Sequence, residues 1–364
     1  MRKFLPAAVM AICAIALTNA GAQEQRPAPT AQQSQPLSAA SKAAAVDLLA
    51  QNLSSQYVYA DLGDKMAAAI RDHLRKGDYE KVATHAEFAE LLTAHVHAVT
   101  PDKHLNIRYV PEAKPDMPRP APTQVMPSEV KKRLESGTYL NFGIEKVERL
   151  PGNIMYLKLN GFFNADFAKT AATAAMNLAA NGNAMIIDLR QNGGGDPRMV
   201  AFVASYLLGD QKVHLSDIYF RADNETNSFW SDPSVPGPRF GADKPVYVLT
   251  SGKTFSAAED FTYNLQALKR ITVVGETSGG GAHPIRPFTI DPNMVAIIPV
   301  GRSINLITNG NWEGTGVKPD IAVAADKALA KANSLALRQV MAQVKDPGER
   351  ADLEKKLANL EAAL

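Results

Sequence analysis

The chain has 364 residues, of which 46% are hydrophobic and 21% charged, and its formal net charge is +2. These values are close to those of average globular proteins, so they exclude wholesale disorder and collagen-like repeats. The length allows about two domains of ~150 residues each. Lys and Arg number 39 against 37 Asp and Glu, which gives no positive field for non-specific binding of nucleic acid.

The first 22 residues have the pattern of a cleavable secretory signal. Two basic residues, Arg2 and Lys3, precede an apolar run over residues 4–17 and a small-x-small motif at residues 20–22. The apolar run is shorter than the ~20 residues that a membrane-spanning helix needs. We expect cleavage after Ala22, or two residues earlier, and an exported mature chain, periplasmic or extracellular, with no membrane span.

Signal removal would leave a mature chain without cysteine, since Cys13 is the single cysteine of the sequence. Disulfides, thiolate catalysis and cysteine metal sites are then excluded. Lipidation of Cys13 is the alternative, but apolar residues continue past it to Leu17, which disfavours that reading. His95 and His97 are two residues apart on a helix pattern and face different sides, so they make no metal pair. The prediction is therefore no metal and no cofactor.

A small helical domain is predicted near the N-terminus. Residues 23–37 are rich in Gln, Pro, Ala and Ser, which predicts a disordered lead. Within residues 38–110, apolar side chains recur at helical spacing in three stretches. The third stretch begins with a capping box formed by Thr84 and Glu87. The apolar positions are Val46, Leu49 and Leu53; Met66, Ile70 and Leu74; and Phe88, Leu91, Leu92 and Val96.

A proline-rich connector and an α/β core are predicted next. Six prolines between residues 111 and 127 predict a stiff connector over 111–138 without regular structure. From 139 to 325, strand and helix patterns alternate, which predicts a mostly parallel sheet with both faces covered. Helical periodicity predicts C-terminal helices over 326–364. The expected strands are 154–159, 184–189, 246–249 and 271–274, the helices are 166–180, 197–208 and 256–268, and a hairpin is centred on 291–293.

Ser256 is a candidate nucleophile because it lies where a buried strand pattern gives way to a helix. Amides at a helix start have no partner within the helix and can stabilise a developing oxyanion. The next two residues, Ala257 and Ala258, are small and leave room for a substrate. The alternative is that Ser256 only caps the helix.

The run Gly193-Gly194-Gly195 follows the strand pattern 184–189 and is a candidate oxyanion loop. Three glycines let the backbone approach a ligand closely. The run has neither GxGxxG spacing nor a following Gly-Lys-Ser/Thr, which argues against a phosphate site. The carboxyl ends of neighbouring parallel strands meet at one edge of a sheet, so this loop is expected beside Ser256. The alternative is an ordinary tight turn.

A serine nucleophile needs a base, and His104 and His283 are the two candidates. His104 follows the third helix pattern, at a junction from which loop residues can reach a cleft. His283 lies in the run Gly-Ala-His-Pro after the second glycine-rich stretch. Glu313 or Asp102 could orient the base. Spacing alone does not choose among these side chains.

Four ordered motifs resemble the tail-specific, or C-terminal processing, serine peptidase family. The motifs are IIDLRQNGGG (186–195), TSGKTFSAAE (250–259), GETSGGG (275–281) and EGTGVKPDI (313–321), and the resemblance covers residues 40–330 approximately. The resemblance implies a crotonase-like α/β core with its nucleophile at Ser256. It also implies oxyanion amides from Ala257 and from Gly193 or Gly194.

The bacterial processing branch of that family has a Ser–Lys dyad and a PDZ domain. Its lysine lies in a Thr-Phe-Gly-Lys-Gly segment, where this chain reads Thr-Ser-Gly-Gly-Gly at 277–281, and residues 110–138 are too few for a PDZ domain. The chain therefore resembles the branch of the tricorn core and the interphotoreceptor retinoid-binding protein modules. His104 and Glu313 match the positions of the tricorn histidine and glutamate. Tricorn has a serine just before the histidine, where this chain has Lys103, so Asp102 or a water would have to link the pair.

The resemblance implies a secreted serine peptidase that hydrolyses peptide bonds of peptides or proteins through an acyl-enzyme on Ser256, with His104 as base. The alternative is a non-catalytic protein that binds a lipophilic, retinoid-like ligand on the same fold. An acyl-CoA hydratase is disfavoured because export would remove the chain from CoA pools. No nucleic-acid partner is expected, and packing of the helices at 326–364 against a second copy of the chain stays open.

Overall fold

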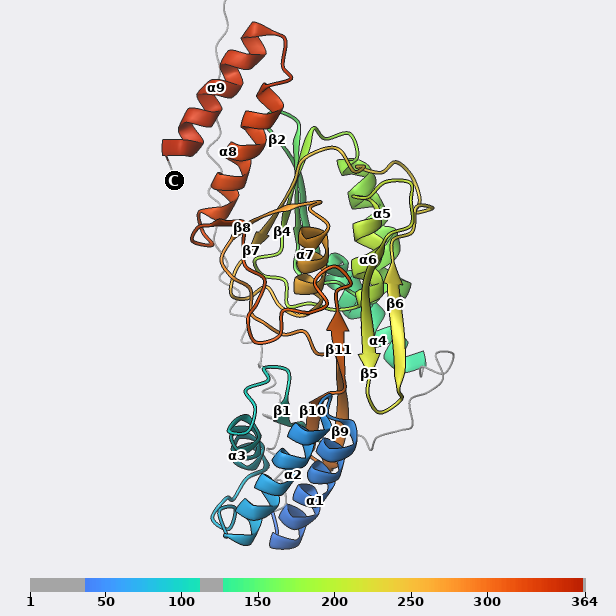
Figure 1. Ribbon diagram of the computed structural model, residues 1–364, viewed down its shortest axis with the longest axis vertical. Helices are drawn as coiled ribbons and strands as arrows, with labels where there is room; N and C mark the ends of the chain where they lie inside the picture. Colours follow the sequence, from blue (N-terminus) through green and yellow to red (C-terminus); the bar gives the residue numbers. More distant parts are fainter. Residues whose placement is uncertain (1–36, 112–126, 363–364) are drawn as a thin grey trace, which may run out of the picture. The chain divides into compact units, whose positions relative to one another are not determined.

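The computed structural model describes residues 37–111 and 127–362 and shows a mixed α/β fold (Figure 1). The predicted signal, almost all of the predicted disordered lead, and residues 112–126 of the predicted connector lie outside the described residues. Within the described residues, no helix is both long enough and apolar enough to cross a membrane.

Three helices form the N-terminal part, as the apolar spacing predicts. They are α1 (Ala39–Gln56), α2 (Ala60–Arg75) and α3 (His85–His97), and strand β1 (Asn106–Tyr109) follows them. The capping box of α3 is present: Glu87 N–H donates to the Thr84 hydroxyl and Thr84 N–H donates to the Glu87 carboxylate, each over 3.2 Å. The predicted helix start is therefore confirmed.

The N-terminal helices share their core with a hairpin from much later in the chain. This hairpin consists of β9 (Ile285–Asp291) and β10 (Met294–Pro299), and it pairs with β1 in the antiparallel order β1-β10-β9. Met294 and Ile298 are buried against apolar side chains of all three helices. The helical domain predicted over 38–110 is thus not self-contained, because the three helices leave an apolar face that the hairpin covers.

A six-stranded sheet forms the centre of the second part of the chain. Its strands are β2 (Ile144–Leu150), β3 (Ile154–Leu159), β4 (Ala184–Asp188), β7 (Val246–Thr250), β8 (Thr272–Gly275) and β12 (Ile321–Ala322). They lie in the order β12-β8-β7-β4-β3-β2; the β2–β3 pair is antiparallel and the other pairs are parallel. Every residue of β4 and β7 is buried, as in parallel sheets that are covered on both faces.

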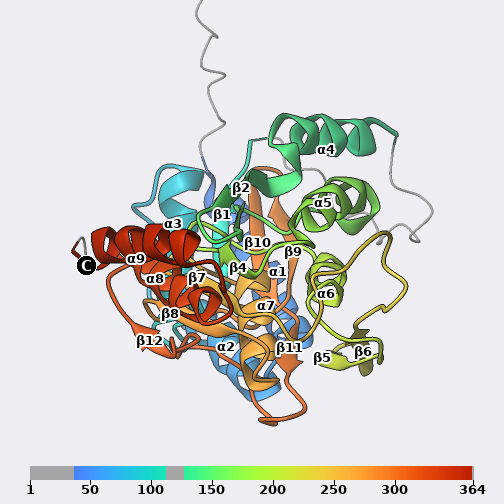
Figure 2. The same ribbon diagram turned by 90° about the horizontal axis from the view of Figure 1, so that it is seen from above.

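Helices cover both faces of this sheet (Figure 2). One face packs against α5 (Ala165–Ala179), α6 (Pro197–Ser205) and α7 (Ala257–Ala267), and the other packs against α8 (Ala328–Met341), which is followed by α9 (Pro347–Ala362). Successive residues of β4 point to opposite faces: Ile186 contributes to the cluster with α8, and Ile187 to the cluster with α5 to α7. The alternating pattern predicted this layered core correctly.

Residues 127–138 differ from the prediction, because they are helical where an irregular connector was expected. Helix α4 covers Pro127–Tyr139 and is followed by the short 3-10 turn η1 (Asn141–Gly143). Pro127 is compatible with this helix because a proline at the first helical position has no hydrogen bond to lose and already has a helical φ. Pro127 therefore marks where the helix begins and does not prevent it.

A second small sheet was not predicted at all. It contains β5 (His214–Phe220), β6 (Glu225–Trp230) and β11 (Gly301–Ile304), in the antiparallel order β11-β5-β6. Arg221, at the turn of the β5–β6 hairpin, donates to the carbonyls of Ser54 and Tyr57 at the end of α1. These bonds satisfy carbonyls that the helix leaves unpaired at its C-terminus.

Candidate active site

The site begins where the parallel strands β4 and β7 end. Asp188 of β4 lies opposite Leu249 of β7, and the two segments that follow are hydrogen-bonded to each other. The Thr254 hydroxyl donates to the Leu189 carbonyl over 2.8 Å, and Phe255 N–H donates to the Asn192 carbonyl over 3.0 Å. The glycine run and the turn that carries Ser256 are therefore neighbours, as the sheet-edge argument predicts.

Ser256 has a strained backbone conformation at the start of α7. Its φ is 55° and its ψ is −122°, in a region that residues with a Cβ atom rarely adopt. Such strain persists only where the surroundings enforce it, and it is concentrated at functional sites. Here Ser256 N–H donates to the Glu259 carboxylate over 2.8 Å. The turn thus presents a serine at the positive end of a helix.

Glu259 connects this turn by hydrogen bonds to the second glycine-rich stretch, residues 278–281. Its side chain is fully buried and accepts hydrogen bonds from the Ser278 hydroxyl and from the N–H groups of Gly280 and Gly281, besides that of Ser256. Burial raises the pKa of Glu259, and these four donors act against that rise. Glu259 was not among the predicted site residues, although the spacing Ser-x-x-Glu is the pattern of a capping box.

Gly194 lies against Ser256 so closely that no other residue fits. A Cβ atom at Gly194 would lie 2.7 Å from the Cβ of Ser256 and 3.0 Å from the nitrogen of Ala257, and the φ of Gly194 is +109°. Gly194 N–H donates to the Asn192 side chain over 2.9 Å. In the part of the chain that the structure describes, the N–H groups of Gly193 and Ala257 make no hydrogen bond. Of the two glycines predicted as oxyanion donors, Gly193 has the available amide.

The two candidate histidines are brought together by one sheet. His104 lies two residues before β1 and His283 lies two residues before β9, and both strands run antiparallel to β10 between them. β1 and β9 therefore run in the same direction and begin at the same end of the sheet. Two strand spacings amount to about 10 Å, so a side chain between the histidines can contact both.

Asp102 is that side chain. One of its oxygens accepts the backbone N–H of His104 over 2.9 Å, and the other lies 2.8 Å from Nδ1 of the His283 ring and accepts the Tyr57 hydroxyl. Burial raises the pKa of Asp102, but the hydrogen bond and charge of His283 and the bond from His104 outweigh it, so the pKa is below its ordinary value. Asp102 is therefore a buried, ionised carboxylate.

His104 itself is buried and lies against Phe255, the residue before Ser256. The two ring centroids are 4.6 Å apart, and Nδ1 of His104 has no hydrogen-bond partner in the described part of the chain. Burial lowers the pKa of His104 to about 4; Asp102 raises it and His283 lowers it further. His104 is thus neutral at neutral pH, which is the form that can accept a proton. Within the described residues, no hydrogen bond joins the Ser256 side chain to either histidine.

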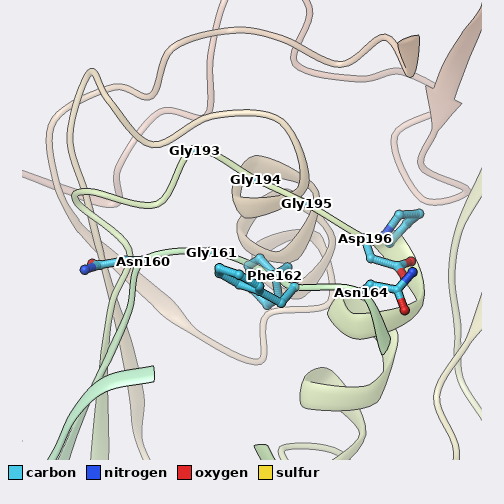
Figure 3. Close-up of a pocket in the computed structure, with 10 residues that line it drawn as sticks. Asn160, Gly161, Phe162, Asn164, Gly193, Gly194, Gly195 and Asp196 are labelled. Atoms are coloured by element: carbon cyan, nitrogen blue, oxygen red, sulfur yellow. The ribbon is translucent and has the colours of Figure 1, made fainter. Parts of the chain in front are cut away.

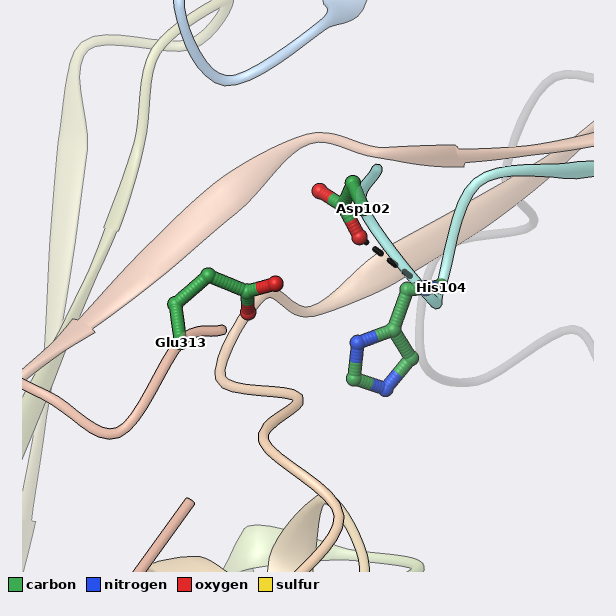
Figure 4. Close-up of side chains that lie close together, drawn as sticks. All are labelled: Asp102, His104 and Glu313. Atoms are coloured by element: carbon green, nitrogen blue, oxygen red, sulfur yellow. Dashed lines mark hydrogen bonds between the residues drawn. The ribbon is translucent and has the colours of Figure 1, made fainter. Parts of the chain in front are cut away.

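Glu313 completes the cluster from the loop before β12. One of its oxygens accepts Ala282 N–H over 2.6 Å and lies 3.5 Å from Nδ1 of His283. Burial raises the pKa of Glu313, and the neighbouring His283 lowers it. Figure 4 shows Glu313 facing the ring of His104, with Asp102 close by. The structure therefore places both candidate carboxylates near both candidate histidines.

Asp102, His104 and Glu313 also form a set of donor types that could hold a metal ion. One oxygen or nitrogen atom of each lies within 4.8 Å of those of the other two. Carboxylate and imidazole are common ligands of zinc. The oxygens of Asp102, however, already accept the hydrogen bonds described above. These bonds to Tyr57, to the backbone of His104 and to His283 already account for the position of Asp102.

Lys103 does not contact this cluster of carboxylates. Its ammonium group is exposed and donates to the Gly279 carbonyl, in the loop that Glu259 also holds. Lys103 therefore ties the segment of His104 to the second glycine-rich stretch, and any link between His104 and Glu313 has to come from another group.

A cavity of about 560 Å³ opens beside the first glycine run (Figure 3). It is lined by residues 160–164, which connect β3 to α5, and by residues 193–197. Phe162 N–H donates to the Gly194 carbonyl and Asp196 N–H to the Phe162 carbonyl, so the two segments are bound to each other. Because Gly194 contacts Ser256, the cavity offers space for a ligand next to the serine.

Comparison with known families matches two parts of the chain. Residues 153–323 match peptidase family S41, and residues 36–142 match the N-terminal domain of peptidase family S41 in eukaryotic IRBP. The fold and these matches define the class of protein, a serine-type peptidase. The chain belongs to peptidase family S41.

Solved structures with the same fold cover most of the chain. A candidate peptidase from Parabacteroides merdae ATCC 43184 is 18% identical, with a TM-score of 0.56 over 81% of this chain and 96% of that chain. A lipoprotein from Streptococcus agalactiae is 13% identical, with a TM-score of 0.54 over 81% and 96%. A mutant of CPAF is 10% identical, with a TM-score of 0.54 over 82% and 96%. At these identities the likeness shows the fold.

Proposed function

We propose that this protein is an exported serine peptidase that hydrolyses peptide bonds through an acyl-enzyme on Ser256. The observation that carries the proposal is the strained turn of Ser256, packed against Gly194, with the amides of Gly193 and Ala257 unbonded among the described residues. An oxyanion next to Ser256 would find these two N–H donors available. Membership of family S41 supports the same reaction.

The reaction follows the usual course of acyl transfer. His104 takes the proton of the Ser256 hydroxyl as its oxygen attacks the carbonyl carbon of the scissile bond. The resulting oxyanion accepts hydrogen bonds from Gly193 and Ala257. His104 then gives the proton to the leaving amine, and a water molecule repeats the sequence on the acyl-enzyme. A neutral His104 is ready for the first step, since burial holds its pKa far below neutrality.

The carboxylates orient and stabilise the base once it is charged. If His104 accepts the serine proton at Nε2, its Nδ1 already carries a proton, so both ring nitrogens are donors once the ring is charged. Nδ1 has no partner among the described residues, and one ring nitrogen of His104 lies within 4.8 Å of a carboxylate oxygen of Glu313. His283 holds Glu313 and Asp102 together, because its Nδ1 lies within 3.5 Å of an oxygen of each. In this proposal His283 is a positioning residue, and it takes the linking role for which Lys103 has no suitable contact.

Export is the second part of the proposal, and residues 1–22 support it by their composition alone. It is tested by expressing the whole chain in a Gram-negative host and measuring the mass of the protein in the periplasmic and external fractions. We expect a chain that begins at Gln23. A full-length chain retained in the cytoplasm would contradict this part and leave the chemistry open to separate test.

The chemistry is tested by replacing Ser256→Ala. We expect the variant to lose both peptide hydrolysis, profiled on a peptide library, and labelling by a serine-reactive fluorophosphonate. Ser228→Ala, an exposed serine of β6, is the matched control and is expected to keep both. Labelling that survives in Ser256→Ala would refute the assignment. Absence of hydrolysis and labelling in the unchanged protein would favour a ligand-binding protein on this fold.

A further inference from the structure

A second cavity, of about 340 Å³, continues from the first one toward helix α4. Three phenylalanines line it, Phe142, Phe163 and Phe167, together with the α4 side chains of Lys132, Arg133 and Ser136. Phe163 and its neighbour Asn164 line both cavities. The two cavities therefore adjoin each other at Phe163 and Asn164, and together we call them the groove, which extends from the glycine run beside Ser256 to the surface of α4.

The apolar part of the groove is held by unusual backbone geometry. Phe142 has a φ of 51°, which is rare for a residue with a large side chain, and its ring packs edge-on against Phe163 at 6.5 Å between centroids. A Cβ atom at Gly137 would lie 2.7 Å from the Phe142 ring, so glycine lets α4 approach it. Strained residues of this kind persist at ligand sites because the surrounding structure enforces them.

The α4 end of the groove is basic. Lys132 and Arg133 are exposed and form no ion pair within the described part of the chain, whereas Lys131 on the same helix pairs with Glu135. Asp196 lines the groove nearer Ser256, but its charge is matched by Arg198. A bound segment thus meets apolar rings and then two positive charges that form no ion pair with a described side chain.

We propose that this groove selects substrates in which a large apolar side chain is followed directly by an acidic residue. The apolar side chain lies among the phenylalanines, and the carboxylate of the next residue is bound by Lys132 and Arg133. The two cations lie on the exposed surface of α4, where a bound peptide can continue past them into solvent. We therefore expect them to bind an acidic side chain within a continuing peptide and not the carboxylate of a chain end. This inference rests on the proposed function, since it places the groove beside the scissile bond.

Binding to the full-chain Ser256→Ala variant tests the inference without any chemistry. The probes are fluorescein-labelled hexapeptides with an amidated C-terminus and a central Phe-Asp, Phe-Asn or Ala-Asp pair, and affinity is measured by fluorescence anisotropy. We expect Phe-Asp to bind on the order of fivefold more tightly than Phe-Asn, as for exposed ion pairs. We expect Ala-Asp to bind on the order of tenfold more weakly than Phe-Asp, because the apolar contact is lost.

Variants of the groove separate its two parts. The double replacement of Lys132→Gln and Arg133→Gln should abolish the preference for Phe-Asp over Phe-Asn, whereas Lys131→Gln, the matched control outside the cavity, should keep it. Phe163→Ala should weaken both Phe-containing peptides and leave Ala-Asp unaffected. The charge variants replace exposed side chains, so they remain informative if Phe163→Ala fails to fold.

Equal affinity for Phe-Asp and Phe-Asn would overturn the inference, and so would an equal loss of preference in Lys131→Gln. A Phe-Asn peptide with a free C-terminal carboxylate serves as a further arm. If only that peptide gains affinity through Lys132 and Arg133, the groove binds a chain end, contrary to the inference. If Ser256→Ala abolishes hydrolysis but the peptides do not show this binding pattern, the groove inference alone is refuted. If the peptides show the binding pattern but the unchanged protein hydrolyses nothing, the proposed function alone is refuted.

Discussion

The buried environment of His104 leads to a prediction about acid pH. A general base works only in its neutral form, and the pKa of His104 is lowered from 6.5 to about 4. At pH 5.5 a histidine with a pKa of 4 is about 97% neutral, whereas one with a pKa of 6.5 is about 9% neutral. Acylation of Ser256 should therefore keep nearly its full rate at pH 5.5 and fall by half only near pH 4.

The assay is the second-order rate of fluorophosphonate labelling between pH 3.5 and 8 at constant ionic strength, with circular dichroism to show that the chain stays folded. Labelling needs no knowledge of the substrate, so it reports the base directly. Asp102 raises the pKa of His104, and Asp102→Asn should move the midpoint to lower pH. A midpoint at pH 6 or above in the unchanged protein would refute the reasoning, since it would require a solvated histidine.

The same shift links His104 to stability. Its pKa is lower in the folded chain than in the unfolded chain, so between pH 6.5 and 4 the unfolded chain binds the proton more readily. This contribution to the free energy of unfolding is present above pH 6.5 and is lost as the pH falls to 4, by at most roughly 3 kcal/mol. Urea unfolding at pH 7 and pH 4.5 should show that His104→Gln loses less unfolding free energy between the two pH values than the unchanged protein does. An equal loss in both proteins would contradict the link.

Two further variants probe the positions around the serine. Gly194→Ala should lower kcat/KM by on the order of a hundredfold or more, because its Cβ would meet Ser256, where a misplaced reacting group is costly. In the control variant Gly209→Ala the new Cβ would meet no atom within 4 Å, so kcat/KM should not change. Equal effects of the two variants would count against the close packing at Gly194. His283→Gln should lower kcat by on the order of ten- to a hundredfold, since the buried Asp102 and the half-buried Glu313 lose their shared donor. His85→Gln, in a buried pair with Asp291, should reduce stability and spare kcat. A normal kcat in His283→Gln would contradict its positioning role.

The local patterns of the sequence predict much of the fold. The apolar run of β4, the capping box before α3 and the strand-to-helix junction at Ser256 depend on neighbouring residues, and the structure has all of them. The β5–β6 hairpin was missed because β6 is exposed along almost its whole length and carries no alternation of apolar and polar residues. The proline-rich stretch predicts no helix α4, whereas a helix accepts Pro127 at its first position.

The candidate site could be predicted only as separate parts. Ser256 and the glycine run follow neighbouring parallel strands, so general rules of sheet topology bring them together. The contact of Asp102 with His283 spans 181 residues and depends on the pairing of β1 and β9 with β10. No spacing in the sequence reveals this pairing, which explains why spacing alone does not choose between the two histidines and the prediction of His104 as base depends on the family resemblance.

That three-stranded sheet also determines how the chain can be divided. His104 and His283 are attached to strands of the β1-β10-β9 sheet, whereas Ser256 follows a strand of the six-stranded sheet. A chimera that exchanges residues 37–143 with those of another family member would therefore pair a foreign β1 with the resident hairpin. Such an exchange should preserve function only if residues 283–300 are exchanged too. Two stretches that lie far apart in the sequence must therefore be exchanged together.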